Sequence, residues 1–493
     1  MDETLRKQID AWTETDEHGR IVDMLGQISP EERDSEATGL LARAYNNLGE
    51  YEKALELLDS IEEEEAGDTN WNFRKGYALY FLDRYKEALA CFKKADELTP
   101  EDEDTIEFIR SCNSYLPFRK RVKDFWKWFT DNEEELSRIV ENRGQLDGGD
   151  TVEFVTAGTN LIDEDVHFNL GGDYEFTFSV EGNTHLFYLY PYIVSQMPAQ
   201  FKDKWHFFPF NQGTDASFSF GMYGANVDMA QVQVSAAYQE DINAFNIHFY
   251  EEQLCSLEEA QSYNAYYIMM EIMLGEGLSY QYIASVERAD APLENMIKLP
   301  ELRAYITDTL KAHGKEIFDN PQQVYTSYRF EPQENEELRF DVMAGSSCFQ
   351  PLVANYYNGS TELFDRLNGF GAQAVFIAFP YENKEEGDGK KVLDFRYELE
   401  DRLAAELLEP EGLGLLLGGA IGTGTCYIDL LLFDESAFME KIVPFLKDYP
   451  QYHFYLSDFR QGSDLCRLYE TEDDESEAVS YTHLRAHETG AYL

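Results

Sequence analysis

Two stretches decide the N-terminal fold: ARAYNNLGEYEKALELL at residues 42–58 and GYALYFLDRYKEALACF at residues 76–92. The second repeats the first at a spacing of 34 positions, from residue 42 to residue 76. The matched positions are Ala42/Gly76, Tyr45/Leu79, Gly49/Asp83, Tyr51/Tyr85, Ala54/Ala88 and Leu58/Phe92. Small residues let two helices cross closely, and larger residues fill the space between them. Each copy is therefore predicted to be a pair of packed helices.

This small–aromatic–small pattern, with Ala95 and Pro100 closing the second copy, resembles the tetratricopeptide repeat. The resemblance implies an all-α solenoid over residues 1–116 that works by binding another protein. A degenerate leading helix pair is predicted over residues 3–28, because its apolar residues keep helical spacing. A capping helix is predicted over residues 105–116, since a terminal repeat must present a polar outer face.

The resemblance also implies which residues bind a partner, namely the outward positions of each first helix. These positions are Arg43, Asn46, Asn47, Phe73, Tyr77, Tyr80 and Phe81. The family's clamp for a C-terminal carboxylate needs Asn, Lys or Arg at positions that Phe73 and Tyr77 occupy here. An aromatic groove with one arginine instead suits an apolar or extended peptide. The alternative is that these aromatic side chains pack against the middle region of the same chain.

The composition of the 493-residue chain is globular and strongly acidic, with 94 acidic and 40 basic residues and a net charge of −54. The length predicts about three domains. The acidic charge argues against nucleic acid as a partner, because phosphate binding needs a basic surface. The six cysteines are dispersed, which is typical of free thiols in a reducing compartment.

No membrane partner is expected, and a cytoplasmic location is predicted. The charged N-terminus has no apolar signal segment. The most apolar stretch, residues 412–433, is rich in glycine and flanked by acidic residues, so it is predicted to form two buried strands joined by a glycine turn. The oligomeric state is left open.

The middle of the chain is predicted to be a helical connector and linker, 117–150, followed by an α+β domain, 151–330. The linker is GQLDGGD at residues 144–150. Alternating patterns predict one mainly antiparallel sheet with helices on one face. The predicted strands are 174–180, 205–210, 216–223, 227–236, 244–250 and 278–286, and the predicted helices are 185–201 and 257–274.

A second α+β domain is predicted over residues 331–470. Its order is strand 372–379, helix 392–408, strands 413–421 and 427–433, helix 437–446 and strand 452–458. This βαββαβ order is typical of ferredoxin-like folds. In strand 427–433, Ile428, Leu430 and Leu432 share one face, which is predicted to lie under the helices.

No catalytic, cofactor or metal site is readable in the sequence. The glycine stretch GGAIGTG at residues 418–424 lacks the Lys-Ser/Thr ending of a phosphate loop and is interpreted as a hairpin. The pairs Arg396/Glu400 and Glu398/Arg402 stand four residues apart and are interpreted as solvated ion pairs.

The last fourteen residues, SYTHLRAHETGAYL at 480–493, differ in composition from the acidic run before them. They resemble a translated sequencing-adapter fragment, so this segment is interpreted as non-native. A genuine disordered tail is the alternative.

The whole chain is similar to bacterial proteins in which tetratricopeptide repeats precede α+β domains of unknown function. The leading hypothesis is a cytoplasmic adaptor or scaffold that binds a protein through its repeats and has no readable catalytic site. Two alternatives stay open: an enzyme whose site is assembled from distant residues of the α+β domains, and an acidic, immunity-type partner that neutralises a basic protein.

Overall fold

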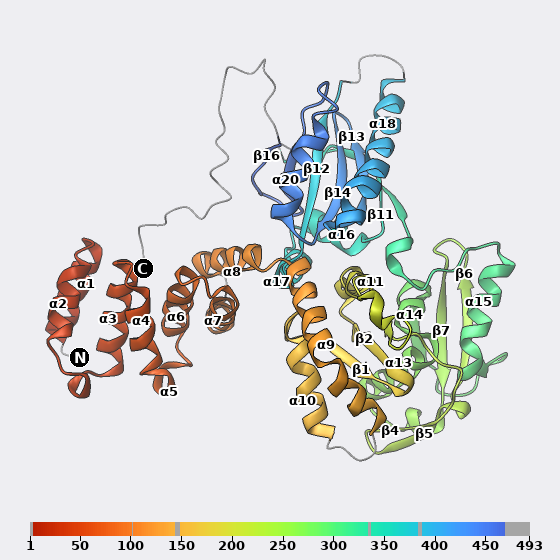
Figure 1. Ribbon diagram of the computed structural model, residues 1–493. Helices are drawn as coiled ribbons and strands as arrows, with labels where there is room; N and C mark the ends of the chain where they lie inside the picture. The colour runs from red at the N-terminus through yellow and green to blue at the C-terminus, as the bar shows by residue number, and fades with distance from the viewer. Residues whose placement is uncertain (1–2, 101, 143–147, 334–336, 383–386, 469–493) are drawn as a thin grey trace.

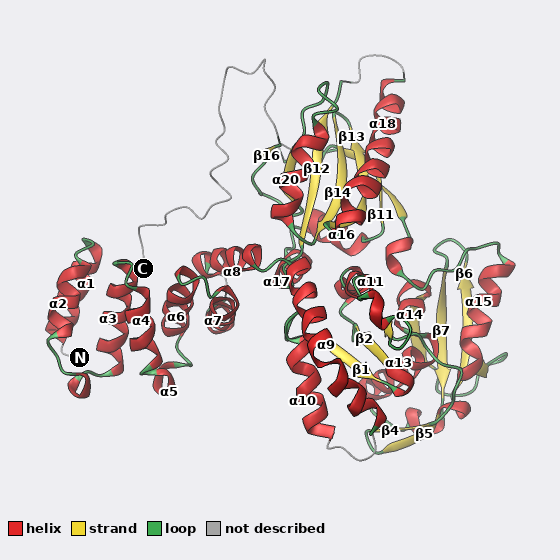
Figure 2. Ribbon diagram, viewed as in Figure 1, coloured by secondary structure: helices red, strands yellow, loops and turns green. Residues whose placement is uncertain are grey.

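The computed structural model describes residues 3–100, 102–142, 148–333, 337–382 and 387–468. Figure 1 shows a helical region, α1–α8, that extends from a larger body made of the remaining elements. In Figure 2 all the strands drawn belong to this body. The predicted tail at 480–493 lies outside the described residues, and so does most of the predicted linker; its last three residues, from Gly148, begin helix α10 (Gly148–Thr159).

The helical region contains the predicted helix pairs. Its elements are α1 (Glu3–Glu14), α2 (His18–Gly26), α3 (Ser35–Asn47), α4 (Tyr51–Asp59), α5 (Glu62–Glu65), α6 (Thr69–Phe81), α7 (Tyr85–Leu98) and α8 (Glu103–Tyr115). Helices α6 and α7 start 34 positions after α3 and α4, as the sequence spacing predicts. A Cβ added at Gly76 would lie 2.9 Å from Cε1 of Phe92, so the small residue permits the close crossing of α6 and α7.

Three aspartates follow the same 34-residue spacing, and they are not among the residues from which the repeat was recognised. Asp34, Asp68 and Asp102 precede α3, α6 and α8, and each side chain accepts a hydrogen bond from a backbone N–H in the first turn. The bonds come from Ala37, Trp71 and Thr105, at 2.8, 2.8 and 2.9 Å. An aspartate at the N-cap accepts a hydrogen bond from a backbone N–H that has no acceptor within the helix. Helix α8 therefore begins as a third copy of the same unit.

The first part of the body packs a small sheet against two helices. Its elements are α9 (Phe118–Glu141), α10, β1 (His167–Leu170), β2 (Glu175–Ser179), the 3-10 turn η3 (Thr184–Tyr188), α11 (Tyr190–Ser195) and β3 (His206–Phe208). Phe176 and Phe178 of β2 enter a core with Phe125 and Phe129 of α9. The predicted helix 185–201 is shorter than expected, because Pro191 lies in the first turn of α11 and Pro198 follows the end of the helix.

The next part has its own sheet and its own core. Its elements are β4 (Ser219–Met222), β5 (Ala225–Asp228), β6 (Gln233–Gln239), β7 (Ala244–Tyr250), α12 (Glu252–Cys255), α13 (Glu259–Leu274), α14 (Glu276–Tyr282), β8 (Ile283–Arg288), β9 (Ile297–Lys298) and α15 (Leu302–Ala312). The sheet order is β8-β7-β6-β9, and α13 and α15 contribute to its core.

The expectation of one sheet between residues 151 and 330 is wrong, because these strands form the β1–β3 sheet, the β4–β5 hairpin and the β8-β7-β6-β9 sheet. The predicted strand 278–286 is also partly wrong. Glu276–Tyr282 is helical, and the strand begins at Ile283.

The last part of the body is a seven-stranded antiparallel sheet in the order β10-β11-β13-β14-β12-β15-β16. Its elements are β10 (Thr326–Arg329), β11 (Val342–Ser347), α16 (Gln350–Asn358), α17 (Glu362–Gly369), β12 (Gln373–Pro380), α18 (Asp388–Leu403), a short π-helix (Ala404–Leu408), α19 (Glu409–Glu411), β13 (Gly414–Gly422), β14 (Thr425–Leu432), α20 (Glu435–Leu446), β15 (Tyr455–Asp458) and β16 (Cys466–Arg467). Strands β13 and β14 form the predicted hairpin, and the turn falls at residues 423–424.

Both faces of this sheet are buried. Ile428, Leu430 and Leu432 pack in one core with Leu399 of α18 and Phe438 of α20, which confirms their predicted facing. On the opposite face, Tyr427 and Leu431 join the core that contains α9 and the β1–β3 sheet. The first and last parts of the body therefore share a core.

That opposite face also holds a buried ion pair. Arg339 and Asp429 are both excluded from solvent, and both terminal nitrogens of the guanidinium donate to the carboxylate, Nη2 to Oδ2 at 3.1 Å. Aromatic rings surround the guanidinium, with the Phe459 centroid 4.5 Å and the Phe376 centroid 5.2 Å from Cζ. The hydroxyl of Tyr328 is a further acceptor, 3.3 Å from Nη2.

The charged pairs of α18 differ from the expectation of solvated pairs. Arg396 and Glu400 are buried, with Nε and Oε1 3.1 Å apart, and they lie over β13. A Cβ added at Gly419 would come within 2.4 Å of Oε1 of Glu400, so the glycine leaves space for this pair. Arg402 pairs with Glu406, Nε to Oε1 at 2.8 Å, instead of with Glu398.

Candidate functional site

The predicted polar groove residues contact neighbouring helices. Asn46 is only 2% exposed, and its Nδ2 donates to the carbonyl of Arg74 in α6 at 2.9 Å. Asn47 lies 3.5 Å from Nδ1 of His18 in α2. Arg43 is half-buried, and burial lowers the pKa of its guanidinium. Asn46 therefore stabilises the contact between α3 and α6 and is not available to a partner.

Three of the four predicted aromatic residues pack against the next helix of the same region. The Phe108 ring of α8 lies 5.8 Å from Phe73, 5.4 Å from Tyr77 and 5.2 Å from Tyr80. Tyr80 is buried, and its hydroxyl lies 2.6 Å from Oγ of Ser111. Tyr80 is thus part of the core, whereas Phe73 and Tyr77 keep part of their surface exposed. Among the described residues, the ring contacts of this set lie within α6 or reach α4, α7 and α8, and none reaches the body.

Phe81 is the most exposed member of the predicted set, with 42% of its surface accessible. Its ring stacks on Tyr51 of α4, with centroids 4.8 Å apart and ring planes 9° apart. Tyr77 lies beside the pair, 4.7 Å from Phe81. The sequence assigned Tyr51 to packing between repeats and so missed its part in this surface, which we call the aromatic patch: Tyr51, Tyr77 and Phe81.

The helical region joins the body through a buried arginine. The guanidinium of Arg121, on α9, donates to the carbonyls of Leu116, Ile162 and Gly369 at 2.9, 3.1 and 3.0 Å. It also donates to Oδ1 of Asn113 in α8. Burial lowers the Arg121 pKa to about 10, so the side chain stays charged at neutral pH. One side chain thus ties α8 and α9 to α17 and to the loop after α10.

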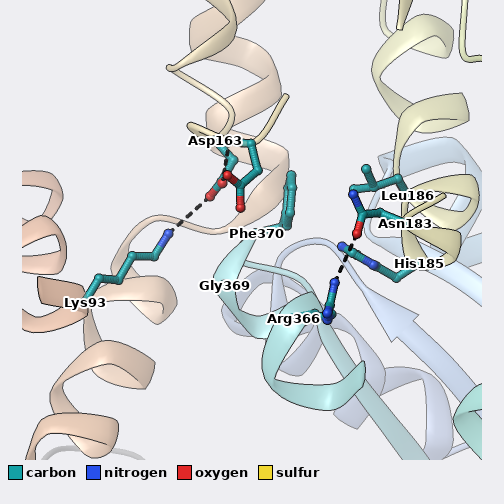
Figure 3. Close-up of a pocket in the computed structure, with 9 residues that line it drawn as sticks. Lys93, Asp163, Asn183, His185, Leu186, Arg366, Gly369 and Phe370 are labelled. Carbon is teal, nitrogen blue, oxygen red and sulfur yellow. Dashed lines mark hydrogen bonds and ion pairs between the residues drawn. The ribbon is translucent and has the colours of Figure 1, made fainter. Parts of the chain in front are cut away.

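Beside this joint is a pocket of about 160 Å³. Its walls come from α7, the loop after α10, the η3 turn and α17, and its lining residues are Lys93, Asp163, Asp165, Asn183, His185, Leu186, Arg366, Gly369 and Phe370. Figure 3 shows Lys93 next to Asp163 on one side and Arg366 next to Asn183 and His185 on the other. None of these residues was singled out from the sequence, because they come together only in the folded chain.

A larger cleft of about 980 Å³ lies between the β1–β3 sheet and α13. On one wall Glu175, Thr177 and Ser179 alternate along β2, opposite to the face that carries Phe176 and Phe178. The other wall is the face of α13 formed by Asn264, Tyr267, Ile268 and Glu271. No lysine, arginine or histidine is among the described residues that line this acidic cleft.

Glu276 forms the floor of the acidic cleft and connects its two sides. Its Oε1 accepts from Oγ of Ser179 at 2.7 Å and from the backbone of Val180 at 3.0 Å, and its Oε2 accepts from the backbone of Asn211 at 2.8 Å. Burial raises the pKa of nearby Glu271 to about 7, with repulsion from Glu276 and Glu181 as further causes. The alternation EFTFS at 175–179 was the sequence signal that a polar sheet face exists here.

The Glu271→Gln variant is expected to raise the melting temperature at pH 8 but not at pH 4. The folded-state pKa of about 7 lies above the ordinary value of 4.5, so the folded state holds this proton more tightly. The free energy of unfolding therefore falls as pH rises from about 4.5 through about 7. Glutamine does not ionise, so the variant does not lose this stability. Thermal melts from pH 4 to pH 8 test this, with Glu175→Gln on the exposed rim as the matched control. Equal melting temperatures at pH 8 would contradict the raised pKa.

Within the described ranges, no three His, Cys, Asp or Glu side chains are placed to hold a metal ion. Among the helices that the structure describes, none combines the length and apolar character needed to span a bilayer.

Comparison with known families supports the repeat assignment. The tetratricopeptide-repeat family matches residues 72–102, which contain most of α6 and all of α7. No curated protein and no solved structure matches the chain. The chain therefore contains a tetratricopeptide repeat, a unit that generally mediates protein–protein interaction.

Proposed function

We propose that this protein is an adaptor that binds another polypeptide through its helical region. The observation that carries the proposal is the stacked Tyr51–Phe81 pair, in which Phe81 is exposed and Tyr51 half-buried although the geometry of both rings is already fixed within the repeat. A preformed aromatic anchor loses little side-chain freedom on binding, and aromatic residues are enriched among the side chains that dominate interfaces. Since repeats of this family generally bind proteins, the aromatic patch is the best-supported docking surface.

The partner surface that fits is an apolar or extended segment of polypeptide. The aromatic patch offers ring faces, and Arg43 and Asn47, on α3, are the remaining polar members of the predicted set that are partly exposed. Asn46 and Tyr80 are removed from the predicted set because they are buried. Cytoplasmic location, absence of nucleic acid and membrane partners, and bacterial type remain part of the proposal.

The finer architecture is also proposed. The 34-residue spacing of α3, α6 and α8 with their capping aspartates supports a short solenoid. The strand order β13-β14-β12-β15, with α18 and α20 on one face, supports a ferredoxin-like unit extended by β10, β11 and β16 at its edges. The predicted domain boundaries stay proposals as well.

Affinity capture with the full chain tests the adaptor proposal. Phe81→Ala is expected to lower the affinity for the captured partner about thirtyfold, because truncation of an aromatic anchor commonly costs about 2 kcal/mol. Adding Tyr77→Ala is expected to bring the loss to a hundredfold or more. The binding constant of the captured partner is measured for each variant.

Tyr115→Ala is the matched control for Phe81→Ala. Tyr115 is also exposed and stacks on Tyr85 with centroids 4.2 Å apart, but it lies outside the aromatic patch. Its replacement is expected to leave capture unchanged. Equal capture by the wild type, Phe81→Ala and the double variant would remove the main support for the adaptor.

The acidic cleft favours a second candidate, an enzyme that acts on a polar substrate. A carboxyl group with a pKa near 7 in a large cleft has the property that a general acid or base needs at neutral pH. Under this candidate, Glu271 exchanges the proton and Glu276 holds the floor. The pH dependence of the Glu271→Gln melts tests the property on which this candidate depends.

A further inference from the structure

The pocket beside Arg121 contains a polar side chain without a polar partner. His185 is only 4% exposed and lines the pocket, yet no hydrogen bond joins its ring to any of the described residues. Its one recorded ring contact is edge-on to Phe370, with centroids 5.7 Å apart. Burial lowers the His185 pKa to about 4, so at neutral pH the ring has one N–H donor and one acceptor nitrogen. The His185 ring is therefore free to offer its N–H to a group that occupies the pocket.

Two cations on separate elements line the same space. Lys93 reaches in from α7 and is 3.4 Å from Oδ2 of Asp163, a long contact. Arg366 on α17 donates from Nη1 to Oδ1 of Asn183 at 3.1 Å and pairs with the exposed Glu362. A guanidinium has more N–H donors than these two contacts use. Figure 3 shows Lys93 and Arg366 on opposite sides of the pocket.

The two carboxylates that line the pocket do not use all the N–H donors of Lys93 and Arg366. Asp163 is shared between Lys93 and the buried Arg121, with 3.4 Å in each contact. Its Oδ1 also accepts from the backbone of Asp165 at 3.2 Å. Asp165 itself is exposed at the rim. The interior thus has more donors than acceptors, which is unusual in a chain with a net charge of −54.

We propose that this pocket binds a small anion, a phosphate or carboxylate group, between Lys93 and Arg366 with the His185 ring as a third donor. The volume of about 160 Å³ suits a single such group or a small molecule that carries it. Charge-assisted hydrogen bonds from lysine and arginine are the strong contacts for these oxygens. Because Lys93 belongs to the helical region and Arg366 to the body, the bound anion also links the two parts.

The test uses the full chain with sodium phosphate and sodium succinate as separate probes and sodium chloride of equal ionic strength as the reference. Binding is measured by isothermal titration calorimetry and by the shift in melting temperature. At least one probe is expected to bind and to raise the melting temperature above the chloride reference. Binding of phosphate alone identifies a phosphate group as the ligand, and binding of succinate alone identifies a carboxylate.

Arg366→Gln and Lys93→Gln are each expected to lower the affinity for the probe at least about tenfold, because each removes a charged donor. Both side chains are partly exposed, so the variants keep the fold, which a melt without either probe verifies. Lys94→Gln is the matched control, since Lys94 is the next residue on α7, pairs with Glu97 and does not line the pocket. It is expected to bind as the wild type does.

Three results would overturn the proposal: neither probe binds above the chloride reference, binding is unchanged in both pocket variants, or Lys94→Gln weakens binding as much as they do. The outcome is independent of the adaptor proposal, which depends on Phe81 and on protein capture.

Discussion

Replacing Arg339 with methionine is expected to lower the free energy of unfolding by about 3–5 kcal/mol. The change leaves the carboxylate of Asp429 in a site without solvent, where its partner had supplied two hydrogen bonds. The surrounding rings of Phe376 and Phe459 offer a bare carboxylate no donor. Urea denaturation and thermal melting of the full chain measure the loss.

Two further variants make the Arg339 result specific. Adding Asp429→Leu to Arg339→Met removes both charges and is expected to recover much of the lost stability, because an apolar pair can replace a buried ion pair. Arg138→Met is the matched control, since Arg138 and Glu135 form an exposed pair that contributes at most about 1 kcal/mol. A single Arg339→Met variant with the wild-type urea midpoint would show that the pair does not stabilise the sheet.

The Leu430→Asp variant is expected to unfold the C-terminal sheet. Leu430 is fully buried between β12, β13 and the helices α18 and α20, so an aspartate there is shielded from water. The charge must be buried or protonated, and the apolar contact worth about 2 kcal/mol is lost as well. Loss of the cooperative melt and rapid proteolysis of residues 337–468 are the expected observations.

Leu465→Asp is the matched control for Leu430→Asp. It makes the same chemical change at an exposed leucine of the same part of the chain. Its melting temperature is expected to stay within a degree or so of the wild type, as is usual for surface changes. A soluble Leu430→Asp protein with unaltered melting would contradict the facing of β14.

The repeats could be predicted because their information is local. The spacing of 34 residues fixes α3, α4, α6 and α7, and the same arithmetic applied to Asp34, Asp68 and Asp102 would have found the start of α8 as a third copy. Periodicity also gave the facing of β14, since alternate residues of a strand point to opposite faces. Where apolar runs are short, the pattern is ambiguous, and residues 278–282, predicted as strand, are helical.

The candidate sites could not be predicted, because their residues are far apart in the chain. The pocket joins Lys93, Asp163, His185 and Arg366, and no local pattern connects these positions. The sequence named Phe81 but could not show that Phe108 would cover Phe73 and Tyr80, since the packing of α8 depends on the whole helical region. Arg396 and Glu400 looked solvated because their spacing is that of a surface pair, whereas Gly419 on another element makes room for them.

The joint at Arg121 has a consequence for avidity. Because this buried side chain fixes α8 and α9 against α17, a polypeptide held on the aromatic patch is tethered beside one defined surface of the body. Its next contact is then intramolecular and depends on effective concentration, which reaches the millimolar range over short flexible spans. A surface of the body that binds a segment with only millimolar affinity would thus be occupied when that segment is tethered by the aromatic patch. The same segment free in solution at lower concentration would leave that surface empty.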